Sequence, residues 1–220
     1  MKPSIMIATP MFGGKCHAGY MASVLSLCLE LQKKGWDFYF HYISNESLIT
    51  RARNNIANFF LSTEMSHLFF VDADIVFNPE DVIKMIEEDK DILCGAYPFK
   101  DMSNQYVFNV AENKQKSFNP GDSELKEIIH GGTGYMLIKR HVFDKLKNKV
   151  TEYVGNSRNV NDGDTLFAFF ETPIDLQQKI MLSEDYDFCQ KWTKYGGKIF
   201  LAPYALAKHI GNYSYGQTFS

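Results

Sequence analysis

The sequence has 220 residues, enough for one substantial hydrophobic core and for no more than two small domains. Its hydrophobic fraction of 45% and charged fraction of 22% exclude the disordered and fibrous classes. A formal net charge of −3 excludes a basic surface for nucleic acid or an anionic membrane, so a phosphate-bearing ligand must be bound by a local site.

The first half of the chain alternates short apolar strands with helices. Pro10 and the Gly13-Gly14 turn end the first strand, and Asn78-Pro79 is a helix start. We expect strands at residues 5–9, 38–43, 67–71 and 92–97, and helices at residues 20–34, 48–62 and 78–89. This alternation predicts an α/β fold with a mostly parallel central sheet flanked by helices, which binds ligands at the carboxyl ends of its strands.

The second half has weaker periodicity. Residues 100–127 contain a polar stretch that indicates a loop or an irregular hairpin, and the turn-rich residues 151–164 predict a mobile loop. Between and after these segments we expect a strand at residues 135–138, helices at residues 141–147 and 183–195, and a last strand at residues 198–201. We expect a single domain over residues 1–220.

The sharpest chemical signal is Asp72-Ala73-Asp74, at the end of the apolar run Leu68 to Val71. A spacing of two places both carboxylates on one side of an extended chain, where they can share a hard divalent cation or divide between cation and ribose. A strand-end turn capped by aspartate is the plainer alternative.

Two further candidates lie near the C-terminus. His209, placed after the last expected strand, has a side chain suited to Mn²⁺ or a related ion, although a lone histidine is more often structural. The acids Glu184, Asp185 and Asp187 follow Ser183 in a first helical turn, where they interact favourably with the helix dipole. Alternatively, one of them, by preference Asp185, acts as a general base.

Arginine and glycine residues supply weaker signals. Arg51 and Arg53 share a core-like helix and are either solvated or within reach of a diphosphate. The segment His130 to Gly134 is either a glycine-rich turn or a close approach of backbone to a ligand. Walker, dinucleotide-binding and serine-hydrolase motifs are absent from the sequence, which disfavours those three classes.

The order of several short motifs resembles the GT-A-fold glycosyltransferases, especially small ones from large viruses, phages and bacteria. The match spans most of the chain. The motifs are Ile7-Ala8-Thr9-Pro10, Thr50-Arg51-Ala52-Arg53-Asn54, Phe70-Val71-Asp72-Ala73-Asp74, Gly95-Ala96-Tyr97-Pro98, Gly132-Thr133-Gly134, Ser183-Glu184-Asp185 and His209-Ile210-Gly211.

The resemblance implies a nucleotide-binding half at residues 1–99 and an acceptor and catalytic half at residues 100–220. It implies that Asp74 binds Mn²⁺ or Mg²⁺ directly, that Asp72 contacts metal or ribose, and that His209 completes the shell. Glu184 and Asp185 would be the acidic pair, with Asp185 as base in an inverting transfer. The nucleotide sugar, for which we favour UDP, would be contacted by Thr9, Pro10, Arg51, Arg53, Asp72 and Gly132.

This function is a sugar transfer from a nucleotide-diphosphate sugar to a glycan or other acceptor hydroxyl. Three rivals remain. Asp72-Ala73-Asp74-Ile75-Val76 also fits the nucleophile motif of haloacid-dehalogenase-type phosphatases, with Asp72 as nucleophile, although that motif normally ends the first strand. A nucleotidyltransferase would use similar carboxylates but a more basic, glycine-rich first loop. A non-catalytic sugar-nucleotide-binding module would bind without turnover.

Location is predicted from what the sequence lacks. The four cysteines form no CxxC pattern and fit reduced thiols, and no apolar run is long enough for a signal peptide or membrane span. We therefore expect no transmembrane segment and action in the cytoplasm, which is that of a host cell if the chain is encoded by a virus or phage.

Overall fold

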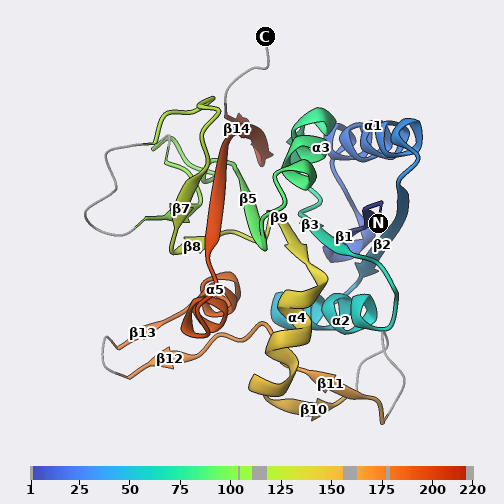
Figure 1. Ribbon diagram of the computed structural model, residues 1–220. Coiled ribbons are helices and arrows are strands. Elements are labelled where there is room, and N and C mark those ends of the chain that lie inside the picture. Colours follow the sequence, from blue (N-terminus) through green and yellow to red (C-terminus); the bar gives the residue numbers. More distant parts are fainter. Residues whose placement is uncertain (1, 104, 111–117, 156–162, 177–178, 217–220) are drawn as a thin grey trace.

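The computed structural model describes residues 2–103, 105–110, 118–155, 163–176 and 179–216. Its centre is a sheet with the strand order β15-β14-β5-β9-β3-β1-β2, to which β4 and β7 add by pairing with β14 (Figure 1). The strands are β1 Ser4–Met11, β2 Asp37–Ser44, β3 His67–Val71, β4 Ile75–Phe77, β5 Ile92–Ala96, β7 Lys126–Ile128, β9 Tyr135–Lys139, β14 Ile199–Ile210 and β15 Ser214–Tyr215.

The predicted α/β class is confirmed. Strands β1, β2, β3, β5 and β14 run in one direction, since β2 and β3 are parallel to β1, β14 is parallel to β5, and β3 and β5 are both antiparallel to β9. Strand β9 runs the opposite way between β3 and β5. Strand β9 is therefore a direct neighbour of β3, and Asp72 and Asp74 follow the end of β3.

Helices cover both faces of the sheet (Figure 1). One apolar core joins the sheet to α1 (Ala18–Lys34) and α3 (Pro79–Glu87). A second core joins the other face to α2 (Ile49–Leu61), α4 (Arg140–Leu146) and α5 (Glu184–Lys194). Local signals define the helix ends: Asn78 caps α3 by accepting from the Glu80 amide, and α1 ends at Gly35, whose φ of 64° suits glycine.

The last strand expected from the sequence, β14, is longer than predicted. We expected it to end at residue 201, whereas β14 continues to Ile210 after an irregularity between Ala202 and Leu206. The expectation that His209 follows the last strand is therefore wrong, because His209 lies within β14. The second half of β14 pairs with β4, a three-residue strand that was not expected from the sequence.

Short antiparallel pairs replace the loops expected in the second half. Residues 151–164 contribute β10 (Glu152–Val154), which pairs with β11 (Thr165–Phe167), while residues 156–162 of the expected mobile loop lie outside the described residues. Residues 100–127 were expected to form a loop or an irregular hairpin, and residues 104 and 111–117 of this segment lie outside the described residues. Its β6 (Phe108–Asn109) pairs with β8 (His130–Gly131), which lies beyond the segment. A further hairpin joins β12 (Ile174–Asp175) to β13 (Ile180–Met181).

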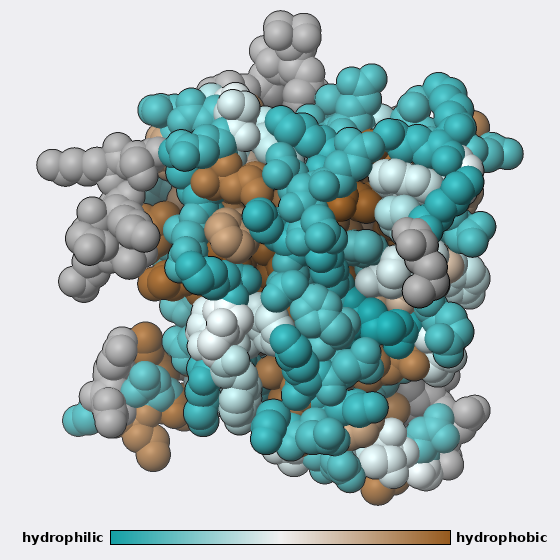
Figure 2. Space-filling view, in the orientation of Figure 1, coloured by the Kyte–Doolittle hydropathy of each residue, from teal (hydrophilic) through white to brown (hydrophobic). Residues whose placement is uncertain are grey.

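The surface in Figure 2 is largely hydrophilic, with an apolar area at the β12–β13 hairpin, where Ile174, Leu176, Ile180 and Met181 are exposed. Within the described ranges, no helix is both long and apolar enough to cross a membrane.

Candidate active site

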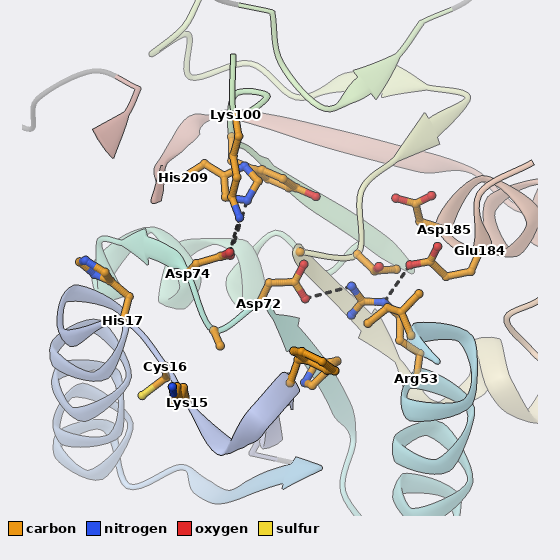
Figure 3. Close-up of a pocket in the computed structure, with 17 residues that line it drawn as sticks. Lys15, Cys16, His17, Arg53, Asp72, Asp74, Lys100, Glu184, Asp185 and His209 are labelled. Carbon is orange, nitrogen blue, oxygen red and sulfur yellow. Dashed lines mark hydrogen bonds and ion pairs between the residues drawn. The ribbon is translucent and has the colours of Figure 1, made fainter. Parts of the chain in front are cut away.

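A pocket of about 480 Å³ opens at the carboxyl ends of β1 and β3. Figure 3 shows that side chains from distant parts of the chain meet there. The residues lining it are Pro10, Phe12, Lys15, Cys16, His17, Ile49, Arg53, Asp72, Ala73, Asp74, Tyr97, Lys100, Thr133, Gly134, Glu184, Asp185 and His209. Most of the predicted site residues therefore share one cavity.

The two aspartates follow β3 in a tight turn. The Asp72 amide donates to the Gly134 carbonyl at 3.0 Å, and the Ile75 amide donates to the Asp72 carbonyl at 3.0 Å, where β4 begins. The side chains of Asp72 and Asp74 are 31% and 34% exposed, so both carboxylates can reach a ligand in the cavity. The buried strand supplies rigidity, and the turn directs the two carboxylates to different partners.

His209 lies beside Asp74 because β14 pairs with β4. In that ladder His209 is opposite Ile75, and the Ile210 amide donates to the Asp74 carbonyl at 2.9 Å. His209 Nε2 is 3.5 Å from Asp74 Oδ1, and the ring is only 16% exposed. Its Nδ1 lies 2.9 Å from the Pro98 carbonyl oxygen. Because a carbonyl only accepts, Nδ1 carries the proton and Nε2 is left facing the carboxylate.

Arg53 joins the two acidic parts of the site. Its Nη2 donates to Asp72 Oδ1 at 2.9 Å and its Nε donates to Glu184 Oε1 at 3.2 Å (Figure 3). The Arg53 side chain is 3% exposed. Burial alone would lower the pKa of the guanidinium, but the charges of Asp72 and Glu184 outweigh burial and raise that pKa above its ordinary value. Arg53 Nη1 is buried and has no hydrogen-bond partner in the described part of the chain.

Glu184 and Asp185 begin α5 on the opposite side of the pocket. Ser183 Oγ hydrogen-bonds to Asp185 Oδ1, which also accepts from the Tyr186 amide at 2.9 Å. Glu184 is turned toward Arg53, whereas Asp185 forms no hydrogen bond or ion pair with another pocket side chain among the described residues, and Figure 3 shows it at the cavity edge. Asp185 is thus placed to accept a proton from a bound molecule.

A glycine-lined wall encloses the hydroxyl of Tyr97. A Cβ added to Gly132 would lie 2.1 Å from Tyr97 Oη, and one added to Gly134 would lie 2.9 Å from Asp72 Oδ2. Burial raises the pKa of Tyr97 well above its usual value, and the charges of Asp72 and Asp185 add to that rise. The phenol therefore stays neutral, and the glycines are required by the close approach of backbone to this ring.

The donor atoms fit a divalent cation only in part. Such an ion binds oxygen and nitrogen at about 2.1 Å, so two of its ligands lie about 3.0–3.4 Å apart, close to the gap between Asp74 and His209. A carbonyl that fixes the far ring nitrogen is the usual support of a metal-binding histidine. Asp72, however, is turned to Arg53, and no group of three acidic, histidine or cysteine side chains converges on one point in the described ranges. Oxygens of a ligand or water must complete the shell.

Three predicted residues are placed away from the cavity. Thr9 is fully buried, with its Oγ1 2.5 Å from Tyr20 Oη. Arg51 makes a double hydrogen bond to Glu46 and lines a separate hollow of about 300 Å³. Gly132 lies behind Tyr97 and does not line the cavity. Pro10 is the part of the first-strand motif that reaches the pocket.

Sequence reasoning missed several pocket residues. Lys100 contacts Asp74 from an irregular segment that carries no periodic signal. Phe12, 78% exposed at the pocket edge, and His17, which caps α1, lie in the loop after β1. The rule that ligands bind beyond strand ends identifies this loop, although it does not identify the individual residues.

The sequence matches no known protein-family profile and no curated protein. The structure is similar to solved structures. A197 from STIV superposes with a TM-score of 0.56 at 18% identity, over 96% of this chain and 86% of that one. GalNAc-T7, solved with UDP, GalNAc and Mn²⁺, gives a TM-score of 0.49 at 12% identity, over 96% of this chain and 44% of that one. The likeness to A197 extends over nearly the whole chain and shows a shared fold, and the expected α/β fold with a mostly parallel central sheet flanked by helices is confirmed.

Proposed function

We propose that the chain is a metal-dependent glycosyltransferase that moves a sugar from a nucleotide-diphosphate sugar to an acceptor hydroxyl. The observation that carries this proposal is the pair formed by Asp74 and His209, whose facing atoms are 3.5 Å apart at the carboxyl end of the central strands. A carboxylate oxygen and an imidazole nitrogen at this distance can bind one dication together, and a dication there would attract a diphosphate.

Asp74 and His209 would hold Mn²⁺ or Mg²⁺, which neutralises charge that develops on the leaving diphosphate. Arg53 orients the Asp72 carboxylate through the 2.9 Å hydrogen bond and leaves its second oxygen available to ribose or metal. The unpartnered Nη1 of Arg53 is a buried donor that a ligand oxygen would satisfy. We assign Arg53 and Asp72 to donor binding on these contacts.

Asp185 is the proposed general base. It accepts the proton of the acceptor hydroxyl while that oxygen forms a bond to the anomeric carbon, and the bond from that carbon to the diphosphate breaks with its electron pair. Attack on the side opposite the leaving group inverts the anomeric centre. Glu184 acts indirectly, because its 3.2 Å contact with Arg53 holds the arginine in place.

The nucleoside is proposed to lie in the loop after β1. Pro10 and the exposed ring of Phe12 form an apolar edge on which a base can stack. We propose UDP as the nucleotide. Thr9 supports this region from behind through Tyr20, and Gly132 leaves space for the Tyr97 ring, which lies against His209. Arg51 supports the turn before α2 through Glu46.

Nucleotide binding can be tested by thermal unfolding with UDP-, GDP- and CMP-sugars, each with and without Mn²⁺. A ligand at about 100 times its Kd contributes about 2.7 kcal/mol, which raises the Tm of a chain of this size by about 5–10 °C. We expect this rise with a UDP-sugar only when Mn²⁺ is present, and we expect Asp74→Asn and His209→Ala to abolish it. Stabilisation by nucleotide sugars that is indifferent to Mn²⁺ would contradict the proposal.

Catalysis is separated from binding by Asp185→Asn. The change should abolish sugar transfer while the Mn²⁺-dependent rise in Tm remains, because Asp185 contacts the acceptor and not the donor. A wild-type chain that binds the nucleotide sugar but shows no turnover would indicate the non-catalytic module instead. Rapid phosphate release from a phosphomonoester without sugar-nucleotide binding would indicate the phosphatase with Asp72 as nucleophile.

A further inference from the structure

The ammonium group of Lys100 lies on the Asp74 carboxylate, where the proposed metal would bind. It lies on the turn after β5, which is held by the hydrogen bond from the Phe99 amide to the Gln105 carbonyl at 2.9 Å. The ammonium contacts Asp74 Oδ2, and the other oxygen of this carboxylate is the one that faces His209 (Figure 3). One carboxylate therefore has a cation on one oxygen and an imidazole beside the other.

We propose that Lys100 and a divalent metal are alternative occupants of the Asp74 carboxylate, and that the displaced ammonium then binds the diphosphate of the donor. This inference rests on the proposed function. It assigns Lys100 two successive partners, and it predicts that removal of the ammonium has opposite effects on the binding of metal and of nucleotide.

The first step is competition. An ammonium that is hydrogen-bonded to Asp74 and a dication on the same carboxylate lie within a few ångströms of each other, where like charges repel strongly in a partly buried site. The Asp74 side chain is 34% exposed and that of Lys100 is 40% exposed, so the pair is solvated enough to open. A metal that binds Asp74 and His209 must therefore release Lys100.

The second step is the new position of the released side chain. The methylene groups of Lys100 pass over Gly211, since a Cβ added to that glycine would lie 3.4 Å from Lys100 Cδ. Glycine at this place puts no side chain against the flexible stem. Lys100 also lines the pocket that holds Asp72 and Arg53, so its released ammonium is within reach of a ligand in that cavity. A diphosphate bound to the metal is the nearest available anion in the proposed complex.

The same short segment also orients the histidine. Pro98, two residues before Lys100, supplies the carbonyl that accepts from His209 Nδ1 at 2.9 Å. The Pro98–Lys100 segment thus directs Nε2 of His209 toward Asp74 and provides the cation that occupies this carboxylate. Lys100 is therefore connected through its own chain segment to His209, the second proposed metal ligand.

The test measures binding of Mn²⁺ alone, from the electron paramagnetic resonance signal of the free ion, to the purified chain without nucleotide. We expect Lys100→Met to bind Mn²⁺ more tightly, on the order of three- to tenfold, because the competing ammonium is gone. Lys100→Arg keeps the charge and should stay near the wild-type affinity. Lys15→Met is the matched control, because it removes a charge from the same pocket at a residue that forms no ion pair with Asp74.

A second measurement follows UDP binding at saturating Mn²⁺ by calorimetry. Lys100→Met should weaken UDP binding by about tenfold, since it removes a charge-assisted hydrogen bond to phosphate. Equal Mn²⁺ affinity in the wild type and Lys100→Met would overturn the inference, as would unchanged UDP affinity. Unfolding by urea confirms that the exposed substitution leaves the fold intact.

Asp74→Asn distinguishes the two proposals. If it removes Mn²⁺ binding while Lys100→Met binds as the wild type does, the metal site stands and the role of Lys100 is refuted. If the wild type binds no Mn²⁺, or if Asp74→Asn has no effect on binding, the metal-dependent function fails and the inference fails with it.

Discussion

Replacing Arg53 with methionine is expected to destabilise the fold as well as the site. The guanidinium, 3% exposed, is hydrogen-bonded to Asp72 and Glu184, whose side chains are 31% and 13% exposed. Removing one partner of a fully buried pair costs about 3–5 kcal/mol, and the partial exposure of Asp72 places the expected loss near the lower end, at about 3 kcal/mol. For a chain of this size the Tm should fall by about 6–12 °C.

The assay is urea unfolding followed by circular dichroism, with Arg51→Met as a matched control in the same helix. Arg51 is 37% exposed, and its partner Glu46, which is 4% exposed, keeps a hydrogen bond from the Leu48 amide, so the control should lose less stability than Arg53→Met does. Adding Glu184→Gln to Arg53→Met should recover part of the loss, because one stranded carboxylate becomes neutral. If Arg53→Met unfolds within about 0.5 kcal/mol of the wild type, the three-residue network does not stabilise the pocket.

Three more predictions use other contacts. Burial lowers the pKa of His67 from 6.5 to about 4, and the charge of Lys139 adds to the effect. The unfolded chain therefore binds a proton at this histidine before the folded chain does, so about 3 kcal/mol of the free energy of unfolding is lost as the pH falls from 6.5 to 4. His67→Gln should flatten the pH dependence of urea unfolding over this range. Gly132→Ala should cost about 1–3 kcal/mol through the clash with Tyr97, and Tyr97→Phe should restore part of it in thermal unfolding. Dialysis against a chelator should remove UDP binding, and calorimetry should show that Mn²⁺ restores it in the wild type but not in Asp74→Asn.

The first half of the fold could be predicted because its signals are local. Residues 67–71 read as a continuous apolar run, and all five are buried in β3. The asparagine cap and proline start of α3 likewise lie next to the helix they begin. A run of residues that is apolar on both faces belongs in the centre of a sheet. Ligands bind beyond the ends of such strands, so a site could be expected at the end of β3.

Pairings between distant segments could not be predicted from local patterns. The three residues of β4 are too few for a periodic signal, and the second half of β14 follows Pro203 and a break in register. The antiparallel direction of β9 is likewise set by its neighbours in the sheet and not by its own residues. These long-range pairings are the ones that shape the pocket.

The two arginines of α2 show another limit. Residues two apart on a helix point about 200° away from each other, so one of Arg51 and Arg53 had to turn away from any shared ligand. The sequence contains that geometric constraint but does not indicate which face is inward. Packing decides it: Arg53 lies 5.4 Å from the Phe70 ring and contacts Asp72 at the end of β3, whereas Arg51 turns to Glu46.

Backbone pairing, rather than side-chain packing, brings Asp74 and His209 together. Ile75 lies opposite His209 in the β4–β14 ladder, and the Ile210 amide donates to the carbonyl of Asp74 itself. Asp74 belongs to the turn after β3, so the ladder joins the first half of the sheet to the C-terminal strand at the proposed metal site. Because each ligand is held by main-chain hydrogen bonds adjacent to it, their 3.5 Å separation is set before any cation binds. A metal bound across the pair would therefore also strengthen the attachment of β14 to β4.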